Sequence, residues 1–463
     1  MELKIENLKW ETFEGRRTEY EKLENVFNNM VDEWIKNERL SPEDRKHYVR
    51  NNFFRKIVEH ITHIVCAERP NVVVANESLQ EYVDKVLFES KFFDNLNGAV
   101  KLSQVLSHII IRVKKVDHLN HSVIEFVHPN KYDVEFDEWD ATVPKKQSLI
   151  FERQIDNRFY RRKEEEWFDN DKKKFFWTQV DEMKDGNGEW VSQNKPAPLI
   201  HDFGFLIHVV RLDVMPGRFW GRPIFYDLED NLREINNLVS QMVNVLRKHA
   251  NPKLVMPSSM FDALVNKNKK LLKQNLIGEQ YIEVGQLEIY RYDPNMDNAA
   301  KPEYVVWDAK LDSGFKLYNL LLDNLSKLGD VPVEVLRTQE GYGNLSGTAM
   351  LLSKTPSYNR AKEIATAFKQ TVEKALYQCQ QLDKMDGKLK QEPEFVTVTF
   401  DHTSSISTDE IKLEMEKYKE GLQSWEETAQ RINNWNSRQL EIERKRIQEE
   451  KANKQVSQEG TSV

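Results

Sequence analysis

Residues 223–249 read PIFYDLEDNLREINNLVSQMVNVLRKH, and this stretch decides the fold class. Its apolar residues follow one another at intervals of 4, 4, 3, 4, 3 and 4: Ile224, Leu228, Leu232, Ile235, Val239, Met242 and Leu246. Such spacing is close to the 3.5-residue repeat of a long helix packed against a neighbour. About 26 residues at 1.5 Å each would make a rod of ~39 Å. The stretch therefore predicts a long helix that buries Leu232, Ile235, Val239 and Met242 against another helix.

Helical patterns also flank this stretch. Residues 48–66 and 77–93 carry apolar side chains at helical spacing, and we expect the second of these helices to end near Gly98. Residues 315–328 predict a further helix, stopped by the sequence Gly-Asp-Val-Pro that follows it. A Gly-rich segment then precedes a helical pattern that reaches residue 385.

Two capping boxes lie near the C-terminus. Ser407 pairs with Glu410 and Ser424 with Glu427, each a serine followed three positions later by a glutamate. Gly421 lies between them, where it can end the first helix. A helical hairpin is therefore predicted here.

Residues 105–215 have a different composition from the helical regions. Short runs rich in Val, Ile, Phe and Tyr alternate with polar residues, as in half-buried strands. Asp185-Gly186-Asn187-Gly188 is typical of a hairpin turn. The sequence thus predicts an antiparallel β-rich region within a mainly helical chain, which is the α+β class.

The composition limits the classes of protein. Among 463 residues, 67 Lys and Arg oppose 75 Asp and Glu, which gives a net charge of −8. Only 39% of residues are hydrophobic and 31% are charged, as in long solvated helices or a subunit that packs laterally in an assembly. No apolar run approaches the ~18 residues of a membrane span. The two cysteines are too few for a disulfide framework. A pI near 5.9 disfavours a protein that binds nucleic acid through a broad basic surface.

Residues that could carry chemistry are few. His60 and His63, and likewise His118 and His121, share a His-x-x-His spacing, but neither pair has a nearby third ligand. We interpret all four as structural or surface histidines. The Gly-rich loop 341–347 lacks the Gly-Lys-Ser/Thr ending of a phosphate-binding loop.

An acidic cluster on the predicted long helix is the remaining candidate for chemistry. Asp227, Glu229, Asp230 and Glu234 could hold Mg²⁺ if their carboxylates converged. They alternate with the apolar stripe, and acids near a helix N-terminus favour its dipole, so we interpret them as a solvated face. We therefore expect no catalytic residue, no cofactor and no metal, and a structural or assembly role.

Five short motifs occur in a recognisable order along the chain. They are VHPNKY at 127–132, GRP at 221–223 leading into LREINN at 232–237, ANPKL at 250–254, GNLSGTAM at 343–350 and EGLQSWEET at 420–428. With them, and with the order of helical and β-rich regions, the chain resembles the portal (head-to-tail connector) proteins of tailed double-stranded DNA bacteriophages. The resemblance covers essentially the whole chain.

The resemblance implies an elongated, mainly helical, portal-type subunit of the α+β class. Its parts would be a wing at 1–222, stem helices at 223–249 and 312–330, a clip at 250–311, a tunnel loop at 331–347, a wing helix and strand at 348–401, and a small crown with a disordered tail at 402–463. Leu232, Ile235, Val239 and Met242 would be the stem-packing residues. The DNA-facing residues of the tunnel loop would be Gln339, Glu340, Tyr342, Asn344 and Leu345.

The same resemblance implies the partners and the location. About twelve subunits would form a ring at one capsid vertex, with double-stranded DNA passing through its channel. The ring would dock the terminase large subunit and later a head–tail adaptor, and would meet the scaffold and the major capsid protein. It would be assembled in the host cytoplasm, lie in the virion and need no membrane.

Three alternatives stay open from the sequence. The chain could form another cytoplasmic ring or scaffold through which no DNA passes. It could be a Mg²⁺-dependent nucleic-acid-processing enzyme that uses Asp227, Glu229 and Asp230. The loop at 331–347 could be a plain surface turn between two helices.

Overall fold

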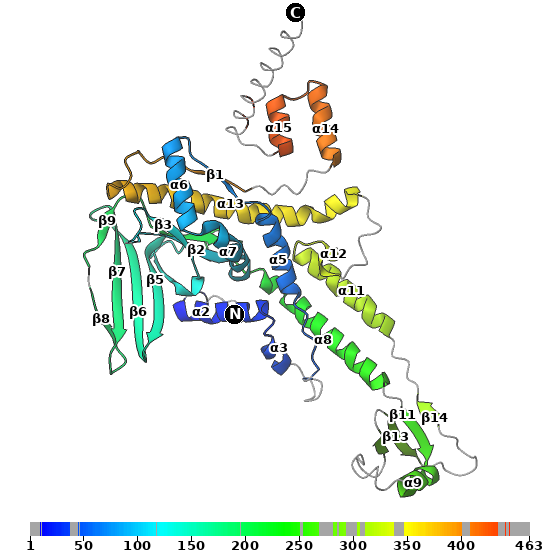
Figure 1. Cartoon of the computed structure of the whole chain (residues 1–463). Helices are drawn as coiled ribbons and strands as arrows, with labels where there is room; N and C mark the ends of the chain where they lie inside the picture. The colour runs from blue at the N-terminus through cyan, green and yellow to red at the C-terminus, as the bar shows by residue number, and fades with distance from the viewer. Residues whose placement is uncertain are drawn as a thin grey trace, which may run out of the picture. The chain divides into compact units, whose positions relative to one another are not determined.

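The structure is a computed structural model of the chain. It describes residues 10, 12–37, 45, 47–116, 118–194, 196–250, 253–267, 281–284, 287–292, 303–305, 311–337, 347–400, 408–433, 440 and 444. The helices and strands are labelled in Figure 1. The chain divides into two compact units, and some helices contribute residues to both. Unit 1 comprises Met1–His60, Gln104–Ser107 and Arg222–Pro356, and unit 2 comprises Ile61–Ser103, His108–Gly221 and Ser357–Val463.

Unit 1 is mainly helical and carries one small sheet. Its elements are α2 (Phe13–Phe27), α3 (Asp32–Asn37), most of α5 (Phe53–Val65), α8 (Phe225–Ala250), β11 (Lys253–Pro257), α9 (Ser258–Lys267), β12 (Tyr281–Val284), β13 (Leu287–Tyr292), β14 (Glu303–Val305), α11 (Leu311–Leu328), α12 (Val333–Leu336) and the start of α13 (Gly347–Met385). The sheet has the order β12-β13-β11-β14, and β11 runs parallel to β13. The long helix predicted over 223–249 is therefore present as α8.

Unit 2 combines helices with three antiparallel sheets, one of which is the pair β1–β15. Its helices are α6 (Glu77–Glu89), α7 (Phe92–Leu106), the larger part of α13, α14 (Thr408–Lys419) and α15 (Trp425–Asn433). Its strands are β1 (Asn71–Val73), β2 (His108–Lys114), β3 (Val123–Val127), β4 (Tyr132–Phe136), β5 (Pro144–Ile155), β6 (Arg158–Asp169), β7 (Lys174–Lys184), β8 (Trp190–Ser192), β9 (Leu199–His201), β10 (Ile207–Arg211) and β15 (Thr397–Thr399). A short 3-10 helix, η1 (Pro129–Lys131), precedes β4.

The β-rich region predicted over 105–215 forms two sheets. One has the order β10-β2-β3, and the other has the order β4-β5-β6-β7-β8, with β9 paired to β7. All of these pairings are antiparallel, as the sequence predicts. A hydrophobic core joins the sheets: Ile110, Val127, Tyr132, Val134, Leu149, Ile207 and Phe219. The chain is thus a mixed α+β protein.

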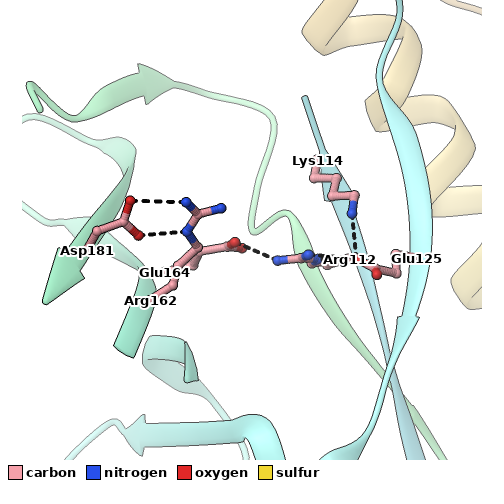
Figure 2. A network of polar contacts seen from close by, with 6 residues as sticks. All are labelled: Arg112, Lys114, Glu125, Arg162, Glu164 and Asp181. Carbon is pink, nitrogen blue, oxygen red and sulfur yellow. Dashed lines mark hydrogen bonds and ion pairs between the residues drawn. The ribbon is translucent and has the colours of Figure 1, made fainter. Parts of the chain in front are cut away.

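A buried ionic network crosses between the two sheets (Figure 2). Arg112 on β2 donates from Nε to Glu125 at 2.7 Å and from one terminal nitrogen to Glu164 on β6 at 2.5 Å. Lys114 lies 2.9 Å from the same Glu125 carboxylate. Burial acts to raise the pKa of Glu125, but the Arg112 and Lys114 cations outweigh it and hold that pKa below its usual range. The guanidinium also covers the ring of Phe151 at 4.6 Å.

One sequence prediction about the helices is wrong. The second helix does not continue toward Gly98, because α6 ends at Glu89 and α7 begins at Phe92. Lys91 has a φ of 50°, which ends α6, and Gly98 lies inside α7. The ~1 kcal/mol cost of a helical glycine is small beside the burial of Phe92 and Leu96 on the same helix.

The C-terminal hairpin follows its predicted signals in part. Ser424 accepts a hydrogen bond from the backbone N–H of Glu427 at 3.1 Å, so it caps α15. Gly421 has a φ of 71°, and the N–H of Leu422 reaches the carbonyl of Lys417 at 2.9 Å, which closes α14. The predicted cap Ser407 and the C-terminal tail lie outside the described residues, apart from residues 440 and 444.

Candidate functional site

The first half of α8 is fixed in the core of unit 1. Phe225, Leu228, Leu232 and Ile235 are all buried. The ring of Phe225 stacks on Trp34 of α3, with the two centroids 6.3 Å apart and an angle of 5° between the planes. The apolar stripe seen in the sequence therefore anchors this half of α8 within its own subunit.

A row of polar side chains on α8 holds an extended segment of the chain. The carbonyl oxygen of the Asn236 side chain accepts from the N–H of Asn51 at 2.9 Å, and Ser240 Oγ accepts from the N–H of Val49 at 2.8 Å. Tyr48 donates its hydroxyl proton to Asn237 at 2.9 Å. No local sequence pattern assigns these residues a role. Asparagine is unfavourable in a helix interior unless its side chain has a hydrogen-bond partner. The adjacent pair Asn236-Asn237 within the predicted helix was therefore the one sequence signal of these contacts.

The second half of α8 lies beside α11 (Figure 1). At Gly314 the two helices come so close that an added Cβ would lie 3.2 Å from Met242 Sδ. Of the four predicted stem residues, Leu232 and Ile235 are buried, and Val239 and Met242 are half-buried within this one chain. Their predicted packing between stem helices of neighbouring subunits stays a prediction.

The exposed residues of this helix pair include large apolar side chains among polar ones. Four large side chains of α11 are exposed: Phe315 by 52%, Leu317 by 41%, Leu320 by 56% and Leu328 by 44%. On α8, Leu246 is exposed by 47%. At 3.6 residues per turn, Leu317 and Leu320 fall on one flank of the face that holds Gly314, and Phe315 falls on the other. The helix α11 thus presents apolar side chains on both of its flanks.

The end of α11 is closely fastened. Asp330 has a φ of 53°, and the N–H of Val331 returns to the carbonyl of Ser326 at 3.1 Å. Ser326 Oγ in turn donates to the carbonyl of Val331 at 2.6 Å. After the short helix α12, Arg337 lies 2.9 Å from Asp323 of α11. The first part of the predicted tunnel loop, residues 331–337, is therefore tied back to α11.

The five predicted DNA-facing residues cannot be placed on this frame. Gln339, Glu340, Tyr342, Asn344 and Leu345 lie outside the described residues.

The acidic cluster of α8 forms ion pairs at the surface. Asp227 lies 2.9 Å from Arg222, and Glu229 lies 3.8 Å from Lys22. The Asp230 side chain is fully exposed, 3.9 Å from Arg233. Among the described residues, no group of three His, Cys, Asp or Glu side chains is placed to hold a metal ion. Convergence on Mg²⁺ is not seen, and the carboxylates lie on a solvated helix face.

The predicted histidine pairs lie in different surroundings. His63 and His118 are exposed, and His60 is partly buried. His121 is buried and its ring meets Tyr82 edge-on at 6.5 Å. Burial and the ammonium of Lys85 lower the pKa of His121. This histidine is therefore a neutral packing residue at pH 7.

The long helix pair of α8 and α11 is thus anchored at one end and carries exposed apolar side chains on both flanks of α11. A family model described as "Phage portal protein, SPP1 Gp6-like" matches residues 7–457. The chain therefore belongs to this family of phage portal proteins, which are structural components of the capsid rather than enzymes.

The chain was also compared with curated protein sequences and with solved structures. No curated protein sequence matches the chain. A chain from a structure titled "Virion of native gene transfer agent (GTA) particle" matches with a TM-score of 0.41 and 8% identity, over 82% of this chain and 89% of that chain. In the described part of the chain, no helix has the length and apolar character needed to cross a bilayer.

Proposed function

We propose that this chain is the repeating subunit of a closed portal ring at one capsid vertex, and that double-stranded DNA passes through the ring during packaging and ejection. In this proposal α8 and α11 form the stem, and residues 250–311 form a clip that docks the terminase large subunit and later a head–tail adaptor. Residues 1–222 and 348–401 form a wing toward the scaffold and the major capsid protein, and residues 402–463 form a crown. Twelve copies are the number that we expect.

The apolar flanks of α11 are the observation that carries this proposal. Burying a large apolar side chain contributes ~1.5–3 kcal/mol, so exposed Phe315, Leu317 and Leu320 favour association. A ring built from identical copies needs two different lateral surfaces on each subunit. A helix with apolar side chains on both flanks supplies such surfaces.

The charge of the chain supports a channel through which DNA slides. Neutralising ~6–10 phosphates makes DNA binding strong and salt-dependent, which would hold the DNA in place. The chain has a net charge of −8, and each added copy adds to that negative charge. A ring of such subunits would therefore hold DNA weakly.

The ring is tested by adding charge to one flank of α11. We expect the double substitution Leu317→Lys and Leu320→Lys, a change of +2, to abolish ring formation, because buried lysines would need to lose their hydration. Native mass spectrometry and negative-stain images measure the ring and the width of its lumen. Asp312→Lys is the matched control, since it also changes the charge by +2, at an exposed position that points away from α8.

Two outcomes would count against the ring or its channel. A wild-type chain that stays monomeric across a range of salt concentrations would contradict the ring. Rings with a lumen narrower than duplex DNA would indicate a scaffold through which no DNA passes.

We also propose that the loop at 331–347 acts as a gate inside the channel. The described ends of this loop support the idea, because Arg337 lies 2.9 Å from Asp323 and α13 begins at Gly347. Deleting residues 339–344 should leave rings and motor docking intact and impair DNA packaging or retention. Packaging assays with assembled deletion rings measure this. Normal packaging and retention would support the plain surface turn instead.

A further inference from the structure

One end of the six-stranded sheet exposes an apolar patch between two arginines. We define the arginine-flanked patch as Arg153, Ile155, Arg158, Tyr160, Met183 and Val191. Ile155 is exposed by 40% and Val191 by 45%. Arg153 and Arg158 are exposed, and neither forms an ion pair within the described part of the chain.

The strand register places these six residues on one face of the sheet. Arg153 pairs with Tyr160, Tyr160 with Met183, and Met183 with Val191, and directly paired residues share a face. Ile155 and Arg158 pair with each other one step closer to the β5–β6 turn. The patch is therefore a continuous row across four strands.

The neighbouring sheet covers only the other half of this face. There Glu164 meets Arg112, and Glu166 accepts from the N–H groups of Leu206 and Ile207 at 2.7 and 3.0 Å. Beyond the Arg162–Asp181 pair, Arg153, Ile155, Arg158 and Val191 are exposed, and Tyr160 and Met183 are half-buried. An uncovered half-face with apolar side chains is a surface that can accept a partner.

The opposite end of the same sheet presents an exposed tryptophan. Trp139, in the β4–β5 loop, is 95% exposed. The loop is nevertheless built firmly: Asp137 accepts from the N–H of Trp139 at 2.9 Å, and Asp140 accepts from the N–H of Thr142 at 2.8 Å. Together with Glu138, these acids place three carboxylates within two residues of Trp139 in the sequence. We call residues 137–143 the tryptophan loop.

The two features are complementary in charge and in apolar character. The tryptophan loop contains three acids and no base, and Lys145 approaches Glu138 only at 4.0 Å. The patch carries two arginines that form no ion pair within the described residues. The acid beside it on the same face, Asp181, is paired with Arg162, and Arg162 together with the more weakly acting Arg153 lowers the pKa of Asp181. The other acids on this face, Asp185 and Glu189, lie at the β7–β8 turn. Tryptophan and arginine are the side chains that most often dominate the energy of protein interfaces.

The loop and the patch of one copy cannot meet. The loop precedes β5 and the patch lies at its far end, and 12 residues of strand span about 40 Å. Only a second copy can bring a loop to a patch. We propose that the tryptophan loop of one subunit docks on the arginine-flanked patch of the next, which gives a head-to-tail contact around the ring. This proposal rests on the proposed ring.

Single substitutions and their mixture test the contact. Trp139→Ala should raise the protein concentration needed for ring formation at least tenfold, while far-UV circular dichroism stays unchanged because the side chain is exposed. Glu138→Arg and Arg158→Glu, each alone, should also weaken assembly. An equimolar mixture of these two variants should restore it, because the reversed loop of one meets the reversed patch of the other. Asp171→Arg is the control for Glu138→Arg. Asp171 lies in the β6–β7 turn, at the same end of the sheet as the tryptophan loop, and this variant should assemble normally.

The outcomes separate this contact from the ring itself. Wild-type protein that forms no rings would contradict the proposed function. Wild-type rings with unchanged assembly of Trp139→Ala, or a mixture no better than its separate components, would overturn the contact. So would Trp139→Ala rings that form normally but fail to join capsid proteins, since the occupant would then be another protein.

Discussion

Replacing Arg112 by alanine is expected to destabilise unit 2 by about 3–5 kcal/mol, the cost of breaking a buried ion pair by removing one partner. The Glu164 carboxylate would be left buried without its cation, and Phe151 would lose the guanidinium that covers it. Glu125 would keep only Lys114. The apparent melting temperature of the full chain should fall on the order of 10 °C, as thermal denaturation followed by near-UV circular dichroism can show.

A second arginine in the same network provides the control. Arg162 makes two hydrogen bonds with Asp181, at 2.7 and 3.0 Å, but its side chain is half exposed. Exposed pairs contribute about 0–1 kcal/mol, so Arg162→Ala should change the melting temperature little. Equal effects of the two substitutions would mean that Arg112 does not join the sheets as described.

Local patterns predicted most of the helices but not how the strands combine. The interval of three and four in 223–249 is a local signal, and α8 follows it closely. Strand β2, in contrast, pairs with β10 through Ile110 and Val209, which are about a hundred residues apart in the sequence. Nothing near either residue specifies that pairing. The alternation of apolar and polar residues therefore could not predict that the β-rich region divides into two sheets.

The polar contacts were hidden for a related reason. Arg112 interrupts an apolar run, and only the fold shows that Glu164 on another sheet compensates its charge. Asn236 and Ser240 likewise find their partners in a segment nearly two hundred residues earlier. The helical pattern of residues 315–328 predicted α11 but did not indicate that Leu317 and Leu320 are exposed. Sequence periodicity does not say which side of an apolar helix its own subunit leaves open.

The stability of unit 2 is expected to depend on pH through Glu166. Its side chain is fully buried, and burial raises its pKa to about 8, although the N–H groups of Leu206 and Ile207 act in the opposite direction. An unfolded glutamate has a pKa of about 4.3. Between these values the folded chain holds a proton that the unfolded chain has lost. The stabilising contribution is therefore complete below pH 4 and declines as the pH rises, by about 1.4 kcal/mol per pH unit, until the folded pKa is passed.

Comparing the wild type with Glu166→Gln isolates this dependence. Glutamine stays neutral, so the stability of the variant relative to the wild type should rise by about 2–3 kcal/mol between pH 5 and pH 7, as urea denaturation at each pH would show. Taking the difference removes shared contributions such as buried His208, whose pKa burial lowers to about 3. Glu165, on the other face of β6, is the control: burial acts to raise its pKa, but Lys146 and Lys163 outweigh it and keep that pKa low. The free energy of unfolding of Glu165→Gln should then differ from that of the wild type by a constant amount between pH 5 and pH 7. Protonation of Glu165 changes the stability only at more acidic pH. A constant difference for Glu166→Gln as well would show that Glu166 is ionised in the folded chain, held by its two backbone donors.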